Sequence, residues 1–249
     1  MLKRTLDIFI STIALLLLSP ILLIAALIVF LKDFHSPLYI APRVGQNGHV
    51  FMMIKLRSMI INADKTGVDS TSANDQRITS SGHFIRRYKL DELTQLWNVL
   101  LGDMSLVGPR PNVKRETDLY TNEEYGLLTV KPGITDFSSI VFSDEGEILK
   151  DRPDPDIAYN QLIRPWKSRL GLLYIGHQSM VLDIKLIFCT IVALFSREKA
   201  LEYAIHLLKH IHAPEDMIQV SRREDDLIPF PPPGSNEIIV SRDLQIEPI

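Results

Sequence analysis

The sequence predicts a mostly α-helical protein with one small β-hairpin (an α+β fold) and an N-terminal membrane helix. Three observations predict it. Residues 8–31 carry no charge, two short β-rich runs flank Asn47-Gly48, and apolar residues recur at helical spacing between positions 93 and 101. A chain of 249 residues can form one sizeable core with appendages.

The uncharged segment 8–31 is long enough to cross a bilayer as a helix. Ser19-Pro20 lies near its middle, and proline removes a backbone donor and predicts a kink. Two topologies follow: a kinked spanning helix, or a re-entrant hairpin with both ends on one face. The residues alone favour the spanning helix, because membrane helices tolerate proline.

A β-hairpin is predicted for residues 38–54, because Asn47-Gly48 separates two strand-like runs. The polar stretch 62–82 predicts a loop, too long for a simple connector.

An amphipathic helix is predicted where five apolar residues follow an i, i+3, i+4, i+7, i+8 spacing; they are Leu93, Leu96, Trp97, Leu100 and Leu101. Gly102 is expected to end this helix. Residues 181–195 are too short an apolar stretch to span a bilayer, so we expect a core helix or an interfacial amphipathic helix. The acidic, proline-containing tail from residue 213 predicts a flexible appendage or a partner-docking strap.

Asp91 and Glu92 open the predicted amphipathic helix and have two interpretations. Acidic residues in a first turn commonly cap free N–H groups and match the helix dipole. Alternatively, the pair is catalytic, with the dipole lowering a carboxyl pKa to keep a nucleophile ionised and both groups able to share a divalent metal. Spacing alone favours the capping interpretation.

Basic residues near this pair are candidates for binding phosphate; they are Lys55, Arg57, Arg86 and Arg110, the last held between Pro109 and Pro111. A restrained arginine suits forked phosphate contacts, although a solvated basic face explains them equally well. The formal net charge of −3 does not suggest a nucleic-acid partner, and the single cysteine, Cys189, excludes an internal disulfide. Asp154-Pro155-Asp156 matches the short D-x-D metal pattern of many sugar-nucleotide transferases, a pattern that arises easily by chance.

Together these features resemble the bacterial sugar transferases, also called monotopic phosphoglycosyl transferases. The match covers roughly residues 2–195 and is carried by the runs KLDEL (89–93), QLWNVL (95–100) and GDMSLVGPRP (102–111), with RVG (43–45), KLRSM (55–59) and KPGIT (131–135) in the same order.

The resemblance implies a catalytic dyad, with Asp91 as nucleophile and Glu92 as its partner. It implies a re-entrant helix broken at Ser19-Pro20, Mg²⁺ as the only cofactor, held at the dyad, and phosphate binding by Arg86 and Arg110. The implied reaction moves a sugar 1-phosphate from a UDP-sugar to undecaprenyl phosphate, releasing UMP, at the cytoplasmic face of the bacterial inner membrane. This is the first membrane step of surface polysaccharide or glycoconjugate synthesis. The rivals are a single-pass glycosyltransferase releasing UDP with Asp154 and Asp156 on metal, and a non-catalytic scaffold of a polysaccharide assembly complex.

Residues 136–147 depart from the family pattern, which leaves the sugar open, as does the oligomeric state, a homo-oligomer included. The expected organisation is a membrane hairpin (1–36), a catalytic domain with membrane-surface helices (37–212) and the acidic extension (213–249), to which the resemblance assigns no role.

Overall fold

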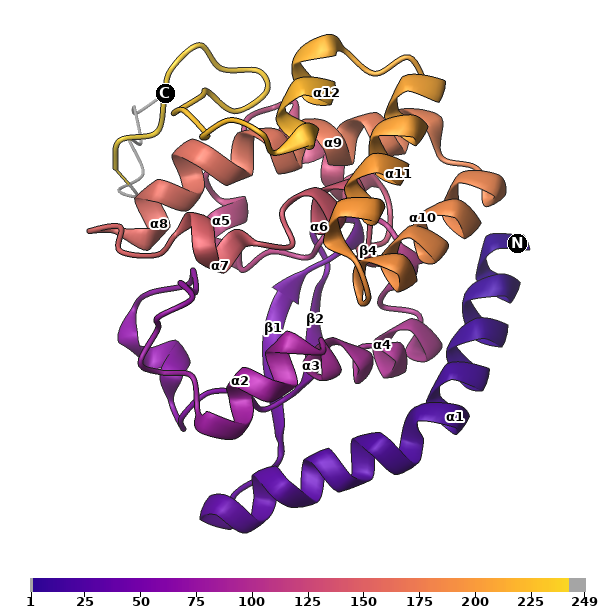
Figure 1. The fold of residues 1–249 in the computed structure, drawn as a ribbon, viewed down its shortest axis with the longest axis vertical. Helices are drawn as coiled ribbons and strands as arrows, with labels where there is room; N and C mark the ends of the chain where they lie inside the picture. The colour runs from indigo at the N-terminus through magenta and orange to yellow at the C-terminus, as the bar shows by residue number, and fades with distance from the viewer. Residues whose placement is uncertain (1, 242–249) are drawn as a thin grey trace.

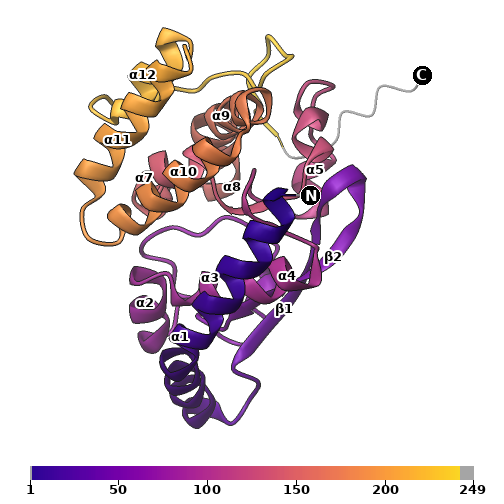
Figure 2. The same ribbon diagram turned by 90° about the vertical axis from the view of Figure 1, so that its right-hand side faces the viewer.

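The computed structural model describes residues 2–241, so the last residues of the expected extension lie outside the described chain. Its architecture is mostly helical with a small β-hairpin, as the sequence predicts (Figure 1). The hairpin and α1–α4 form one half of the molecule, and the later helices form the other half (Figures 1 and 2).

The N-terminal apolar segment forms one long helix, α1 (Leu2–Asp33), with Pro20 inside it. Figure 1 shows that α1 bends along its length, as expected for a helix with an internal proline. Both ends of α1 are bound to the rest of the protein. Near the start, Lys3 Nζ donates to Asp183 Oδ2 at 2.6 Å; at the end, Arg57 donates to both carboxylate oxygens of Asp33 at 2.5 and 2.7 Å.

The predicted hairpin is confirmed. Strands β1 (Leu38–Val44) and β2 (Val50–Leu56) pair antiparallel along their whole length. The turn contains Asn47 (φ 55°) and Gly48 (φ 76°), the left-handed conformations that these two residues favour. The polar stretch that follows is largely a loop, with a short 3₁₀ turn (Ala63–Thr66), and Arg77 organises it by donating to Asp75 and to the carbonyls of Val68 and Ser70.

The predicted amphipathic helix is broken into α3 (Leu90–Leu93) and α4 (Leu96–Leu101), preceded by α2 (Ser80–Arg87). Gly102 ends α4 at φ 97°, as expected. Leu96 is buried, whereas Trp97 and Leu101 are 52% and 70% exposed. One part of the apolar stripe therefore packs into the core, and the other part is exposed at the surface.

Two of the resembling sequence runs meet in a short parallel sheet of β3 (Ser105–Val107) and β4 (Gly133–Thr135). A Cβ on Gly133 would lie 2.1 Å from the Gly108 nitrogen, so only glycine allows this approach. Gly133 N also donates to Pro109 O at 2.9 Å, which fixes the backbone immediately before Arg110.

The helical half contains α5 (Lys114–Thr117), a 3₁₀ helix (Glu124–Thr129), α6 (Phe137–Val141), α7 (Glu145–Ile148), α8 (Pro155–Ala158), a π-helical turn (Tyr159–Ile163), α9 (Arg164–His177), α10 (Met180–Ala193), α11 (Arg197–His210) and α12 (Glu215–Arg222). Its core collects fully buried side chains from α6, α9, α10 and α11, including Phe137, Leu170, Leu186 and Leu208. The divergent segment 136–147 supplies part of this core, and Asp136 closes a capping box at the start of α6.

The described part of the acidic extension packs against the helical half and is not a flexible appendage. Phe230 stacks on Trp166 with ring centroids 4.6 Å apart, and Arg169 lies over Phe230 at 4.8 Å. Arg169 also donates to Pro231 O at 2.9 Å. The proline-rich stretch is therefore a strap that docks on α9 of its own chain.

Candidate active site

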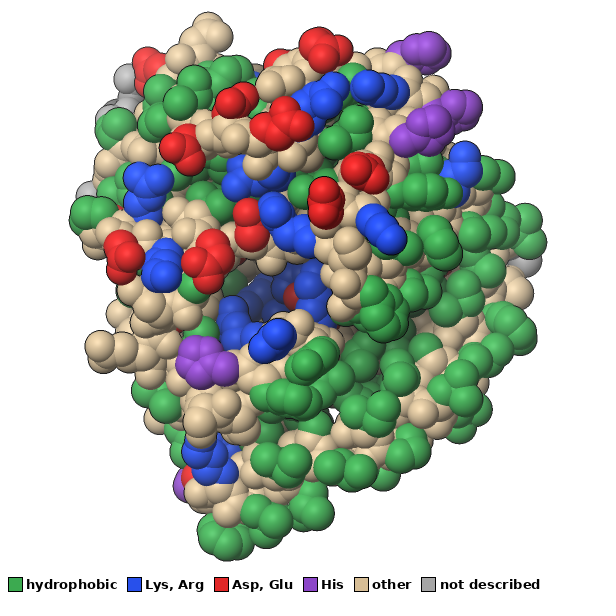
Figure 3. Space-filling model, in the orientation of Figure 1, with side chains coloured by type: hydrophobic (Ala, Val, Ile, Leu, Met, Phe, Trp, Pro, Cys, Tyr) green, Lys and Arg blue, Asp and Glu red, His purple; other side chains and the backbone are tan. Residues whose placement is uncertain are grey.

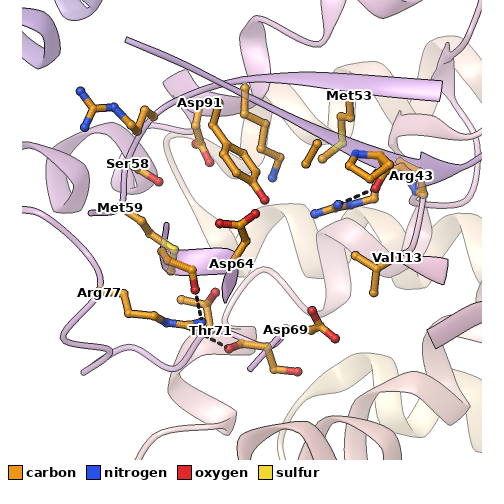
Figure 4. Close-up of a pocket in the computed structure, with 18 of the residues that line it drawn as sticks. Arg43, Met53, Ser58, Met59, Asp64, Asp69, Thr71, Arg77, Asp91 and Val113 are labelled. Carbon is orange, nitrogen blue, oxygen red and sulfur yellow. Dashed lines mark hydrogen bonds between the residues drawn. The ribbon is translucent and has the colours of Figure 1, made fainter. Parts of the chain in front are cut away.

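A cavity of about 760 Å³ opens between the two halves of the molecule. Figure 3 shows a hollow in this face with Lys and Arg side chains gathered in it. Its lining includes Lys55 from β2, Arg86 from α2, Asp91 from α3 and Arg110. Figure 4 shows Asp91, Asp64 and Arg43 pointing into the cavity, with Asp69 and Arg77 of the polar loop on the side opposite Asp91.

Side-chain hydrogen bonds to β2 hold α3 and α4 in place. Thr94 Oγ1 donates to Ile54 O at 3.1 Å, and Asn98, fully buried, accepts from Ile54 N at 2.9 Å and donates to Met52 O at 2.7 Å. These contacts fix the carboxyl-bearing turn beside the strand that carries Lys55. The structure thereby brings together the predicted dyad and a predicted phosphate-binding lysine.

Glu92 is bound by Arg110, whose Nη2 donates to Glu92 Oε1 at 2.5 Å. Burial alone would raise the pKa of Glu92, but the charges of Arg110, Lys55 and Lys89 hold the pKa well below its usual range. The charge of Glu92 in turn raises the pKa of Arg110. Glu92 is therefore ionised and its carboxylate is fixed in orientation.

Asp91 has the opposite environment. Burial raises the pKa of Asp91 above its usual value, and the nearby charges of Lys55, Arg86 and Arg110 offset this only in part. The net result is a raised pKa, contrary to the expectation of a lowered one, because burial outweighs the favourable charges. The cationic groups around Asp91 favour its ionised form.

The cations around the dyad also affect one another. Burial and the charge of Arg110 lower the pKa of Lys55 to about 8. Arg43, from β1, also lines the cavity and was not singled out from the sequence. A cavity with several clustered cations suits a ligand with more than one phosphate.

Two predicted residues have other surroundings. Arg57 lines the cavity, but its guanidinium is bound to Asp33 at the end of α1. Pro109 lines a separate small pocket, whereas Pro111 lines the cavity as expected. Pro109 therefore acts on the site through the backbone that carries Arg110.

The D-x-D motif lies outside the cavity lining. Asp154 caps α8 by accepting from the backbone nitrogens of Asp156 and Ile157, and Asp156, which is buried, accepts from Ser70 N at 2.7 Å. Both carboxylates thus bind backbone groups and stabilise the loop and helix around them.

Sequence reasoning missed Glu145, Tyr159 and Lys167, which line the same cavity. Glu145 and Lys167 form an ion pair in which the side chains are 30% and 14% exposed. Glu145 lies in the segment that departs from the family pattern, and that departure was the available signal.

An exposed apolar face adjoins the site. Residues of α1 and α4 contribute to it together with one side of α10, where Val181, Ile184, Phe188 and Ile191 are each more than half exposed. Figure 3 shows hydrophobic side chains spread along the right-hand edge and the bottom of the molecule. His35 and Ser36, directly after α1, line the cavity, so the cavity reaches the end of the apolar helix.

Comparison with known proteins assigns the chain to a family. The sequence model of the family described as bacterial sugar transferase matches residues 1–197. Escherichia coli K12 has a UDP-glucose:undecaprenyl-phosphate glucose-1-phosphate transferase that is 35% identical over 80% of this chain and 41% of its own length. A UDP-galactose-lipid carrier transferase of Erwinia amylovora is 33% identical over 80% of this chain and 41% of its own length. An exopolysaccharide production protein of Rhizobium leguminosarum is 37% identical over 80% of this chain and 97% of its own length.

The protein therefore belongs to the bacterial sugar transferase family. It spans about two fifths of the length of the Escherichia coli and Erwinia relatives. Among the described residues, α1 is the one helix long and apolar enough to cross a membrane. Together with the family assignment, it indicates a membrane protein.

Proposed function

We propose that the protein transfers a sugar 1-phosphate from a UDP-sugar to undecaprenyl phosphate at the cytoplasmic face of the inner membrane and releases UMP. The observation that carries this proposal is the buried Asp91 in a cation-lined cavity that adjoins an exposed apolar face, with the neighbouring Glu92 bound to Arg110 of the same cavity. The names of the relatives support the same substrate classes.

In the proposed first step, an Asp91 carboxylate oxygen attacks the β-phosphorus of the donor. The bond from that phosphorus to the bridging oxygen breaks, UMP leaves with the electron pair, and an acyl phosphate joins Asp91 to the sugar phosphate. Lys55, Arg86 and Arg110 are the side chains that would bind the phosphates, since guanidinium and ammonium groups donate to phosphate oxygens.

In the second step, an oxygen of the lipid phosphate attacks the same phosphorus and Asp91 is released. Glu92, ionised and bound by Arg110, keeps that arginine oriented towards the site. The lipid would approach from the apolar face, while the soluble donor enters the hollow from the aqueous side.

Mg²⁺ fits the donor set of the dyad, since adjacent carboxylates provide the hard oxygen ligands that this ion prefers. Within residues 2–241, no cluster of three or more His, Cys, Asp or Glu side chains suited to a metal is present. Asp91 and Glu92 would therefore hold the ion together with donor phosphates and water. When bound, Mg²⁺ would neutralise charge on the diphosphate.

A re-entrant α1 is part of this proposal. The contacts of Lys3 with Asp183 and of Asp33 with Arg57 bind both ends of α1 to the same folded body. A helix crossing the bilayer would place its ends about 30 Å apart on opposite sides of the membrane. The bend with Ser19-Pro20 in the helix is compatible with both ends returning to one face.

The experiment is a screen of UDP-sugars with undecaprenyl phosphate and Mg²⁺, scored by the nucleotide released. We expect UMP from at least one donor. Release of UDP instead would favour a glycosyltransferase, and no turnover from a folded protein with an intact dyad would favour a scaffold.

A further inference from the structure

The Glu145–Lys167 ion pair has no part in the phosphate chemistry described above. Glu145 starts α7, and Lys167 is on α9, so the pair joins two elements far apart in sequence. Both side chains line the cavity that contains Asp91 and Arg110. A carboxylate facing this cavity needs an explanation, because it repels the phosphates that the surrounding cations attract.

The position of Glu145 indicates which part of the donor it would face. Its charge acts on Arg110 and on Arg86, so it belongs to the part of the cavity next to the dyad. Asp64 and Asp69 also line the cavity, and their charges act on Tyr39. In a nucleoside diphosphate sugar, the sugar is attached to the phosphate that Asp91 would attack. The sugar must therefore lie beside Asp91 and Arg110, and the nucleoside must lie further away.

We propose that Glu145, held by Lys167, recognises hydroxyl groups of the donor's sugar and so determines which UDP-sugar is used. This inference rests on the proposed function. A carboxylate only accepts hydrogen bonds, and sugar hydroxyls are donors without charge, so they are suitable partners in a cavity that is otherwise cationic. Lys167 offsets the charge of Glu145 and can donate to sugar oxygens.

The chain also restrains the backbone next to Glu145. Asp144 is bound by Arg197 at 2.7 Å and by Arg223 at 3.4 Å, and Arg223 lies over the Phe142 ring at 5.6 Å. Arg223 comes from the C-terminal extension, directly after α12. The extension thus fixes the divergent segment that presents Glu145, and Arg223 acts as a positioning residue.

The test compares Glu145→Gln with Glu147→Gln, a matched control on the same helix whose side chain is 67% exposed. The donors are UDP-glucose, UDP-galactose, UDP-N-acetylglucosamine and UDP-N-acetylgalactosamine, with UMP release as the readout. For Glu145→Gln we expect the ratio of kcat/KM between the best and second-best donor to fall about tenfold, because a site built to bind a hydroxyl discriminates strongly. The control should keep the wild-type ratio.

A second readout, inhibition by UDP, separates recognition of the sugar from an effect on phosphate binding. UDP carries both phosphates but no sugar, so the loss of the Glu145 charge in Glu145→Gln should tighten UDP inhibition only modestly, by a factor that all donors share and that cancels in their ratio. An unchanged donor ratio would overturn the inference. So would markedly tighter UDP inhibition with an unchanged ratio, which would show that Glu145 acts only on the phosphates. Absence of UMP release by the wild type with every donor would instead refute the proposed function itself.

Discussion

At the residue scale, the two adjacent carboxyl groups of the dyad have different surroundings, which supports the different roles proposed for them. Arg110 binds Glu92 and lowers its pKa, whereas burial raises the pKa of Asp91. An oxygen of Glu92 is already occupied by Arg110, so Glu92 is the poorer candidate for forming a covalent bond. Asp91 is therefore the group that attacks phosphorus in the proposed mechanism.

Asp91→Asn should abolish both turnover and the covalent adduct, while Glu92→Gln should slow the reaction and still allow some adduct. An amide lacks the carboxylate oxygen that forms the acyl phosphate. The measurement is intact-protein mass spectrometry after incubation with donor and Mg²⁺ but without lipid. A mass increase with UMP release in Asp91→Asn would refute this assignment.

Lys55 predicts a pH dependence. Its pKa is lowered to about 8, so it is a cation below that pH and neutral above it. Because the phosphates need the cation, kcat/KM for the donor should fall as pH rises through about 8, a parameter that reports the free enzyme. In Lys55→Arg this alkaline fall should disappear, since arginine stays charged.

The matched control for this profile is Lys150→Arg, at a half-exposed residue that does not line the cavity. It should keep the alkaline fall of the wild type. A Lys55→Arg profile that still falls near pH 8 would show that another group titrates there.

The sequence predicted part of this site for a clear reason. Asp91, Glu92 and Arg110 lie in long sequence runs that resemble the family, so they were identifiable. Glu145 and Lys167 meet only through the packing of α7 against α9, which no local pattern reports. Asp183, within the apolar stretch 181–195, is buried and accepts hydrogen bonds from Lys3 and Tyr174, contacts that no local pattern indicates.

At the element scale, the hairpin was predictable because Asn47-Gly48 determines its turn locally. The amphipathic helix expected up to residue 101 forms as two short helices, and Thr94 and Gln95 between them keep right-handed helical backbone angles. Hydrogen bonds between β2 and the side chains of Thr94 and Asn98 hold both helices against the strand, a tertiary effect. The docking of the extension was also not predictable, because a proline-rich strap carries no signal for its binding surface.

The strap gives a prediction about stability. Phe230→Ala removes the stacking on Trp166 and the contact with Arg169. Because Phe230 is half-buried, we expect a loss of about 1–3 kcal/mol, less than for a fully buried phenylalanine. The measurement is the thermal unfolding midpoint in one detergent. Ile228→Ala is the control, since Ile228 is 69% exposed and should leave the midpoint unchanged.

An equal midpoint for Phe230→Ala and wild type would show that the strap contributes nothing to folding. A lower midpoint for both variants would show a general sensitivity of this segment, not a specific contribution from the stacked ring.

At the scale of the whole molecule, one orientation relative to the bilayer must bury the apolar surface in lipid and leave the cation-lined cavity open to water. The exposed sides of α1, α4 and α10 would lie in the bilayer, and the hollow would face water. This placement is consistent only if α1 enters and leaves on the same side, because both of its ends bind the folded body. A spanning α1 would require one set of these contacts to break.

The topology can be tested with single cysteines at the two ends of α1. Leu2→Cys and His35→Cys are suitable because Leu2 is 68% exposed and the His35 side chain is 63% exposed. Each is made in a Cys189→Ala background, although Cys189 is itself buried. With an impermeant thiol reagent on intact spheroplasts, neither cysteine should react, and both should react after the membrane is opened. Labelling of only one of them from outside would place the ends of α1 on opposite faces. In that case Lys3–Asp183 and Asp33–Arg57 could not form together, and the re-entrant topology would be refuted.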